Sequence, residues 1–422
     1  MNNGAVNPSP INSGPVSRIK SFWASPAAGL TVAALALPAC TLLASRGVVV
    51  LFTLVVAISA WRLARRNRKV TPRAKIVTGP VAPIFGALVA WAAVSLAWTL
   101  EPGAAVAKWA TVTALLAGAL ILGAVARMSD DQNRRAVGVA AVAGVAGGVG
   151  LLAVELVSGQ ALTGALRALF SPGSPPLAPE ALNQGACVLA ISVWPAALIL
   201  WHHQHRVLAP FLILTVFGVV SATVSSAAAL AVPVALLGGT AVWWGGRFLA
   251  KALGAAIASL CLIAPIIPLT IARPARLAPY LPPDALPELH RLHLWEFVAE
   301  NVLHHPFTGW GFFASRFLPG GHTDLIPGVP LMALHPHNAA LQIWLELGLP
   351  GAALFAGLLY ALFSRGAATA PDRAGRAALC ATLLAALTIA GLSYGLWQSW
   401  WLAALGLLGA VALCAPAHKI RA

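Results

Sequence analysis

The sequence predicts an all-α polytopic membrane protein with about 12 transmembrane helices and one large helical loop between the ninth and the tenth. Only 9% of the 422 residues are charged and 59% are hydrophobic, whereas a soluble domain carries about 25% charged residues. Apolar runs long enough to cross a hydrocarbon core of about 30 Å recur from Ala28 almost to the C-terminus. These runs form helices because a backbone in lipid must satisfy its own hydrogen bonds.

The expected spans follow one another with short polar breaks, except for one interval. They cover approximately residues 28–44, 47–61, 80–98, 108–126, 136–157, 183–201, 207–223, 226–244, 249–271, 337–363, 377–394 and 397–414. The chain accordingly divides into a disordered cytoplasmic tail at 1–27, nine spans within 28–271, a loop at 272–336, three spans within 337–414 and a second cytoplasmic tail at 415–422. An even number of spans leaves both termini on one side of the membrane.

The net charge of +15 is explained by membrane topology rather than by binding to nucleic acid. With the N-terminus in the cytoplasm, most of the 27 Lys and Arg residues fall in inner loops, as the positive-inside rule requires. Seven basic residues do not: Arg46, Lys108, Arg167, Arg273, Arg276, Arg291 and Arg316. Four of them share the loop at 272–336, which also contains most of the 11 histidines. Insertions of this length are usually functional or disordered, and the tryptophans and apolar periodicity of this one indicate order.

Within the loop, the stretch from Pro287 to Leu303 predicts a helix, since proline is tolerated in a first helical turn and Pro306 stops the helix soon after. One face of this helix is apolar and consists of Leu292, Trp295, Val298, Ala299 and Val302. Arg291 falls inside that face, where a guanidinium is costly unless an anion meets it, and its planar fork of donors suits phosphate oxygens. The alternatives are an ion pair with Glu288, three residues earlier, and a side chain that extends to solvent.

The next segment, from His305 to Phe313, contains two glycines, Gly309 and Gly311, between bulky aromatic residues. Glycine lets a backbone turn tightly. We therefore expect a structural turn that packs against the membrane surface.

The chain re-enters the bilayer through two histidines, His335 and His337. His337 is expected at the N-terminus of the tenth span, where free amides and the positive end of the helix dipole disfavour a protonated ring and favour a nearby anion. A neutral imidazole beside an anionic leaving group is suited to act as a general base. Asn338, Gln342 and Glu346 recur every four residues, so they share one helix face from which they can orient the imidazole or an incoming hydroxyl. The alternative is that His337 only caps the helix or marks the membrane interface.

Taken together, these residues resemble the O-antigen ligase and polymerase superfamily of membrane glycosyltransferases, and O-antigen ligases most closely. The shared elements are Arg291, Trp295, His305-Pro306, Gly309-Trp310-Gly311, His337-Asn338, Leu341, Glu346 and Gly348. Weaker similarity extends the match over most of the chain, at Trp91 to Trp98, Asn183 and Trp397-Gln398-Ser399-Trp400. The sequence differs from the family pattern at one position. Many relatives carry Ser-Arg in the middle of the chain, where this sequence has Ser225-Ser226.

The resemblance implies a GT-C-like protein of the bacterial inner membrane, with cytoplasmic termini and its site on the periplasmic side. It implies transfer of a glycan from undecaprenyl diphosphate to a lipid A-core acceptor sugar, with inversion at the anomeric carbon. The reaction is expected to need no metal or cofactor, and the protein is expected to contact membrane lipid. His337 is then the general base and Arg291 stabilises the departing diphosphate. The residues expected to contact the diphosphate or the substrate are Arg167, Arg273, Arg276, Asn338, Gln342 and His305. Arg167, Arg273 and Arg276 are also candidates to replace the arginine that this sequence lacks at Ser225-Ser226.

Two other functions stay open from the sequence. A polymerase of the same superfamily extends the glycan on its lipid carrier by the same chemistry, although about twelve spans and one dominant loop before the tenth favour a ligase. A secondary transporter also has about twelve helices, but transporters place ionisable residues near the bilayer midplane and often show repeated halves. Here the spans are nearly free of charge and the two halves do not look alike, which disfavours transport.

Overall fold

The structure is a bundle of helices, which confirms the all-α class. The computed structural model describes residues 25–66, 81–173, 175, 177–282, 285–332 and 334–415, so most of the two expected tails lies outside the described residues. The α-helices are α2 (Ala28–Leu43), α3 (Gly47–Arg66), α4 (Val81–Val94), α5 (Pro102–Met128), α6 (Asp131–Val157), α7 (Ala161–Phe170), α8 (Asn183–His202), α9 (Leu208–Ser221), α10 (Ser226–Leu262), α11 (Ile266–Thr270), α12 (Pro274–Leu277), α13 (Leu286–His304), α14 (Ala339–Thr369), α15 (Arg373–Leu392) and α16 (Ser399–Leu413). The short 3-10 helices are η1 (Ser95–Ala97), η2 (Pro179–Leu182), η3 (Ala278–Tyr280) and η4 (Ala314–Phe317). Strands β1 (Asp324–Ile326) and β2 (Val329–Pro330) form an antiparallel hairpin.

Seven helices of the described residues are long and apolar enough to cross a membrane, namely α3, α5, α6, α8, α10, α14 and α15. The shorter apolar helices α2, α4, α7, α9 and α16 accompany them. Large apolar side chains stand exposed on the helix surfaces, for example Leu54 at 56%, Val139 at 65% and Phe211 at 65%. Such a surface is unfavourable in water but matches lipid tails, which are as apolar as leucine. The chain is therefore a multi-pass membrane protein.

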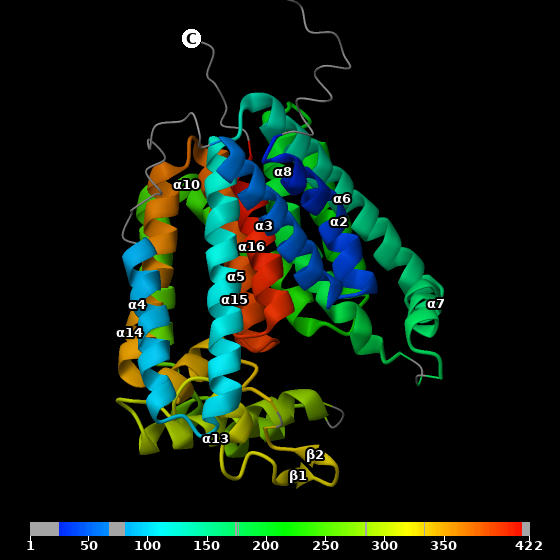
Figure 1. The fold of residues 1–422 in the computed structure, drawn as a ribbon. Coiled ribbons are helices and arrows are strands. Elements are labelled where there is room, and N and C mark those ends of the chain that lie inside the picture. The colour runs from blue at the N-terminus through cyan, green and yellow to red at the C-terminus, as the bar shows by residue number, and fades with distance from the viewer. Residues whose placement is uncertain are drawn as a thin grey trace, which may run out of the picture.

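The loop elements gather at one end of the bundle. In Figure 1, α13 and the β1–β2 hairpin lie across the lower end of the long helices, and we call this the α13 end. Above it, α10 packs on α14 and α15, α2 packs on α6, and α5 packs on α16. Small residues allow close contact, since a Cβ on Gly144 of α6 would stand 2.4 Å from the carbonyl oxygen of Ala34 in α2.

Two expected spans, 226–244 and 249–271, are the two arms of α10. Gly246 breaks this helix with φ 62° and ψ −145°, a left-handed backbone that glycine adopts at low cost. The second arm ends at Leu262, earlier than expected, because Pro265 follows and residues before a proline avoid helical backbone. Gly239 in the first arm lies against Ala381 of α15, and Gly254 in the second arm lies against Phe363 of α14.

The expected span at 337–363 begins later and is divided. Asn338 caps α14 by accepting a hydrogen bond from a backbone amide three residues on, at 3.1 Å. Gly348 then breaks the helix with φ 62° and ψ −162°. Residues 339–347 therefore form a short helical segment at the α13 end, and His337 precedes the helix rather than beginning it.

Candidate active site

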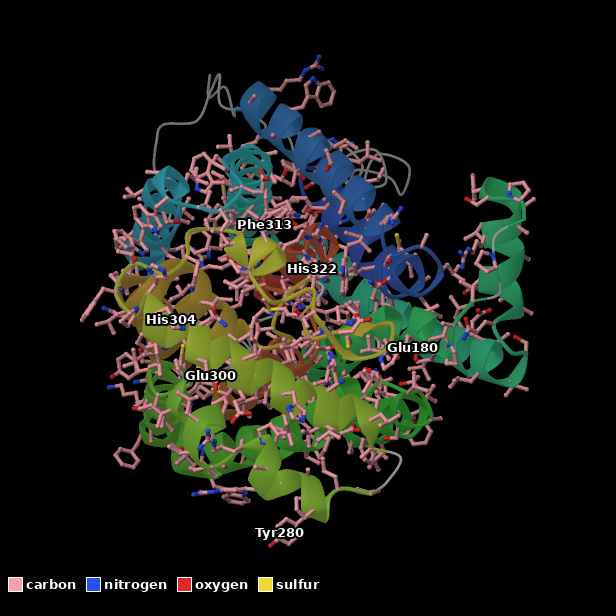
Figure 2. The ribbon with its side chains drawn as sticks, turned by 90° about the horizontal axis from the view of Figure 1, so that it is seen from below. Glu180, Tyr280, Glu300, His304, Phe313 and His322 are labelled. Atoms are coloured by element: carbon pink, nitrogen blue, oxygen red, sulfur yellow. The ribbon has the colours of Figure 1, made fainter. Side chains whose placement is uncertain are left out.

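Helix α13 holds the chain that leads into α14. It crosses the α13 end, as its labelled residues Glu300 and His304 show in Figure 2, and its bounds match the expected helix to within one residue at each end. Its buried residues are Leu292, Leu294, Val298, Ala299 and Val302. Trp295, expected on the apolar face, donates its indole N–H to the carbonyl of Pro336 at 3.0 Å. The helix thereby fixes the segment that carries the two histidines.

The imidazole of His337 is held at one edge. Its Nδ1 lies within hydrogen-bond distance of the carbonyl oxygen of Ser393, in the connection between α15 and α16. A carbonyl oxygen can only accept, so in the neutral ring the proton is on Nδ1 and Nε2 keeps its lone pair. Within the described part of the chain no hydrogen bond engages Nε2. The φ of His337 is 54°, a strained left-handed value of the kind that clusters at functional sites.

The surroundings of His337 keep its ring neutral. Burial lowers the pKa of His337 below the usual 6.5, the Ser393 carbonyl opposes that shift, and the positive charge of Arg291 adds to it. The unprotonated form with a free Nε2 is the form that accepts a proton. Geometry and pKa therefore both suit a general base.

His335 lies beside His337, with ring centroids 4.3 Å apart. Its Nδ1 faces the amide N–H of His337 at 3.2 Å, and its Nε2 faces the side-chain amide nitrogen of Gln398 at 3.0 Å. The oxygen of Gln398 accepts a hydrogen bond from Trp400 at 2.9 Å, which fixes the orientation of that amide. Burial, with a smaller contribution from the positive charge of Arg316, lowers the pKa of His335 to about 3. Burial disfavours the protonated ring, so His335 is a neutral residue that positions the segment before α14.

Arg291 lies close to the same site, because it stands one helical turn before Trp295, whose indole bonds to the carbonyl of Pro336 next to His337. Its side chain is 28% exposed, and Nη1 lies 3.8 Å from Oε1 of Glu288. The ion pair considered from the sequence is therefore present, but it is longer than a hydrogen bond, and a pair of this kind contributes about 0–1 kcal/mol. Within the described residues the other N–H donors of Arg291 make no hydrogen bond, so the guanidinium can bind an anion beside His337.

Gln342 and Glu346, on the polar face expected for α14, are buried and form hydrogen bonds with other protein groups. Glu346 is 0% exposed and Gln342 is 3% exposed. The carboxylate of Glu346 accepts hydrogen bonds from the hydroxyl of Ser315, the amide N–H of Phe313, the side-chain amide of Gln342 and the indole of Trp397. Gln342 in turn accepts from the amide of Leu396 at 2.8 Å. The expected substrate contact of Gln342 is thus replaced by a positioning role, and the side chain of Asn338 is used as the helix cap.

The two glycines after α13 form the expected turn, and both contact the backbone of Glu346 in α14. Gly309 has φ 66°, and a Cβ there would stand 2.5 Å from the backbone carbonyl of Glu346. Gly311 has φ 94°, and a Cβ there would stand 2.4 Å from Cα of Thr99. The amide of Gly311 bonds to the carbonyl of Glu346 at 2.9 Å, which the break at Gly348 leaves without a helical partner.

We expect Gly309→Ala to destabilise the protein. The new Cβ overlaps the Glu346 backbone, and alanine disfavours a φ of 66°, so the free energy of unfolding should fall by more than about 1 kcal/mol. Thermal unfolding of the purified protein in detergent measures this. Gly103→Ala is the matched control, because nothing lies within 4 Å of a Cβ there and alanine favours the helix. An unchanged midpoint for Gly309→Ala would contradict the packing described.

The three arginines expected near the diphosphate make other contacts in the structure. Arg273 forms an ion pair with Glu296 at 3.0 Å. Arg276 donates to a backbone carbonyl at the end of α11 at 2.8 Å. Arg167 lies on α7, which packs on α2 and α6 and stands at the side of the bundle in Figure 1. The structure thus does not assign any of them to the His337 ring.

His305 lies at the far end of α13 from Arg291. About 14 residues separate the two, which at 1.5 Å per residue is about 21 Å. The His305 ring packs edge-on against Trp310, with centroids 4.4 Å apart. His305 therefore supports the turn and does not reach the groups around His337.

The connection between α15 and α16 contributes contacts that the sequence did not predict. Residues 393–398 supply the carbonyl that holds His337, the amide that faces His335 and the indole that bonds to Glu346. Gly395 approaches so closely that a Cβ there would stand 2.7 Å from the His335 ring. The signal in the sequence was the weak similarity around Trp397, which did not indicate what these groups contact.

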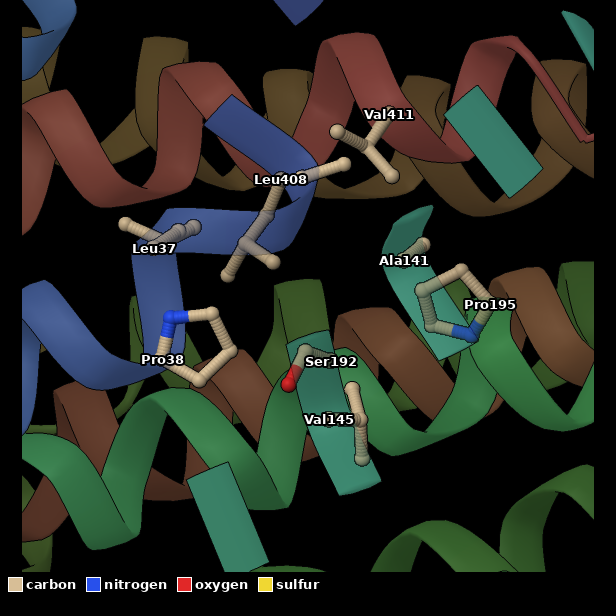
Figure 3. A pocket seen from close by; sticks show the side chains of 9 residues that line it. Leu37, Pro38, Ala141, Val145, Ser192, Pro195, Leu408 and Val411 are labelled. Atoms are coloured by element: carbon tan, nitrogen blue, oxygen red, sulfur yellow. The ribbon is translucent and has the colours of Figure 1, made fainter. Parts of the chain in front are cut away.

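A cavity elsewhere in the bundle plays no part in this site. It has a volume of about 10 Å³ and is lined mainly by apolar side chains from α2, α6, α8 and α16, among them Pro38, Val145 and Leu408 (Figure 3). That is room for about one water molecule. It cannot hold a sugar or a lipid.

The fold and the site define a multi-pass α-helical membrane protein that places a neutral imidazole and an arginine at one end of its bundle. Residues 210–356, which include Arg291 and His337, match the family model described as O-Antigen ligase. This match supports placing the chain in the O-antigen ligase superfamily.

Individual relatives agree with this assignment. The chain is 30% identical over 229 residues to a Rickettsia prowazekii protein named "Putative polysaccharide ligase", and the match spans about half of each protein, 52% of this chain and 55% of the relative. It is 28% identical over 295 residues to a protein of the same name from Rickettsia conorii, covering 67% and 68%. A third, from Rickettsia bellii, is 29% identical over 324 residues and covers 74% and 75%.

Proposed function

We propose that this protein is an O-antigen ligase, which transfers a glycan from undecaprenyl diphosphate to an acceptor sugar of lipid A-core at the periplasmic face of the inner membrane. The observation that carries the proposal is the neutral His337 ring, with Nε2 unpartnered in the described structure, beside the charge of Arg291. The superfamily match over 210–356 and relatives named as polysaccharide ligases support it.

The proposed reaction is a single inverting displacement. The acceptor hydroxyl gives its proton to Nε2 of His337 as its oxygen attacks the anomeric carbon. The bond from that carbon to the diphosphate oxygen breaks on the opposite side, and its electron pair leaves with the diphosphate. Arg291 stabilises the negative charge that develops there. His335, Gln342 and Glu346 touch no reacting atom and hold the base and its loop in place.

The charge pattern supports a periplasmic α13 end. Helices α14 and α16 both start near the site, so their last residues lie at the opposite end. Arg134 donates to the carbonyl of Leu413 at 2.9 Å, and Arg247 donates to that of Ala368 at 3.4 Å, so these arginines belong to the opposite end. By the positive-inside rule that end faces the cytoplasm.

Transfer by the purified protein, with lipid-linked glycan and lipid A-core in excess chelator, tests the proposal. The expected product is glycan joined to lipid A-core, without any requirement for a divalent ion. A glycan lengthened on undecaprenyl diphosphate would instead identify a polymerase of the same superfamily. Transfer that needs a divalent ion would overturn the metal-free mechanism.

The pH dependence of this reaction follows from the His337 pKa. Protonation of Nε2 removes the base, so kcat/KM should fall as the pH is lowered through a pKa below 6.5, and this group should leave the rate unchanged at higher pH. Initial rates between about pH 4 and pH 8 measure the acid limb. An acid limb centred above 6.5 would contradict a base with a lowered pKa.

A further inference from the structure

Two basic side chains that membrane topology does not explain meet at one aromatic ring. Nζ of Lys108, near the start of α5, lies 5.5 Å from the centroid of the Phe313 ring. Cζ of Arg316, in η4, also lies 5.5 Å from that centroid. The two charges are therefore at most twice that distance apart, although they come from separate elements.

The ring between them is held in a strained conformation. Phe313 has a left-handed φ of 66°, which is costly for a bulky residue. Its amide N–H is held by the buried carboxylate of Glu346 at 2.8 Å. In Figure 2, Phe313 and His322 lie near one another on the open face of the α13 end, and His322 bonds to the carbonyl of Arg316 at 3.0 Å. The protein thus fixes this ring and its neighbour at an accessible surface.

No acidic side chain of the described residues neutralises this pair. The ion pairs there involve other residues, and none includes Lys108 or Arg316. Glu346, which bonds to Phe313, is fully buried and already accepts hydrogen bonds from four groups. One cation is enough for attraction to a ring. A second one adds repulsion, which an anion bound between the two would relieve.

Hydrogen bonds connect Phe313 to the His337 site, because Glu346 accepts from the amide of Phe313 and the indole of Trp397, and Gln398 next to Trp397 faces the His335 ring. The charge of Arg316 is among those that act on His335, and the charge of Arg291 acts on the neighbouring ring of His337. The two adjacent imidazoles are therefore exposed to positive charge from two elements, η4 and α13.

We propose that Lys108 and Arg316, beside Phe313, form a second phosphate-binding subsite of this reaction centre, separate from Arg291. The inference rests on the proposed transfer reaction, which offers two sources of phosphate, the diphosphate of the donor and a phosphate on the acceptor glycolipid. Guanidinium and ammonium groups donate charge-assisted hydrogen bonds to phosphate oxygens. Both cationic groups lie 5.5 Å from the centroid of the Phe313 ring, so they are close enough to contact one phosphate group together.

Binding measurements that need no turnover test this subsite. Undecaprenyl diphosphate without glycan is titrated into the purified full-length protein, and lipid A-core is titrated before and after phosphatase treatment. The variants are Lys108→Gln, Arg316→Gln and the double substitution. Arg276→Gln is the matched control, since it removes a positive charge at the same end that bonds only to a backbone carbonyl. Lys108→Arg and Arg316→Lys keep the charges and should bind more tightly than the corresponding Gln variants, which separates a lost charge from misfolding.

The double variant should bind at least one of the two ligands about tenfold or more weakly, while Arg276→Gln changes both by less than about twofold. A loss confined to undecaprenyl diphosphate identifies the donor as the source. A loss confined to lipid A-core that phosphatase treatment abolishes identifies the acceptor. Unchanged binding of both ligands, an equal loss in Arg276→Gln, or a wild-type protein that binds neither ligand would overturn the subsite. A protein that binds but does not transfer glycan would refute the proposed function and leave this result intact.

Discussion

Replacing His337 should lower kcat for glycan transfer by about 10²- to 10⁴-fold, the usual contribution of a positioned general base. Because φ at this position is 54°, His337→Asn is a better variant than His337→Ala. Asparagine tolerates a left-handed backbone and cannot accept a proton near neutral pH. The KM for the donor should change little, since Nε2 meets the acceptor hydroxyl. Steady-state transfer with purified protein measures both constants.

His304→Ala provides the matched control for this experiment. His304 is an exposed histidine of the same loop, at the end of α13 away from Arg291, and its removal should leave kcat within about twofold of the wild type. Unfolding temperatures in detergent show whether the variants fold. A folded His337→Asn protein with wild-type kcat would exclude His337 as the base.

Arg291→Ala should lower kcat by about 10²- to 10³-fold, because it removes a cation that stabilises charge developing on the leaving diphosphate. Arg291→Lys should recover only part of this loss, since an ammonium keeps the charge and loses the planar fork. A second readout comes from pH. The positive charge of Arg291 lowers the pKa of His337, so the acid limb of kcat/KM in Arg291→Ala should move towards higher pH.

Arg273→Ala is the matched control for Arg291→Ala, because Arg273 lies at the same end and pairs with Glu296 on the surface of α13. It should leave kcat and the acid limb unchanged. Equal losses in the two variants would show that general positive charge, rather than Arg291, supports the reaction.

The sequence predicted the parts of this site that depend on local pattern. Helix α13 follows from its period and its prolines, and the turn at Gly309 follows from glycine between aromatic residues. The start of α14 was misplaced by two residues, although asparagine is a strong capping residue and Asn338 carried that signal. The distance between His305 and Arg291 was also available, because a helix of known length separates its ends.

Contacts between distant segments could not be predicted from the sequence. His337 and Ser393 are 56 positions apart, and no local pattern indicates that a backbone carbonyl will meet a ring nitrogen. The same is true of Glu346, which looked like a polar residue facing a substrate and proved to be an internal acceptor for donors from three segments. Arg273 was ambiguous for a related reason, since its partner, Glu296, is set by how α12 packs on α13.

The proton on His337 is positioned by main chain rather than by an acidic side chain. Any amino acid at position 393 offers the same carbonyl oxygen, so the tautomer of the base does not depend on which residue stands there. Point substitutions at this position leave the orienting group intact. Only a change in the course of the polypeptide between α15 and α16 removes it, which ties proton acceptance by His337 to the geometry of these two helices.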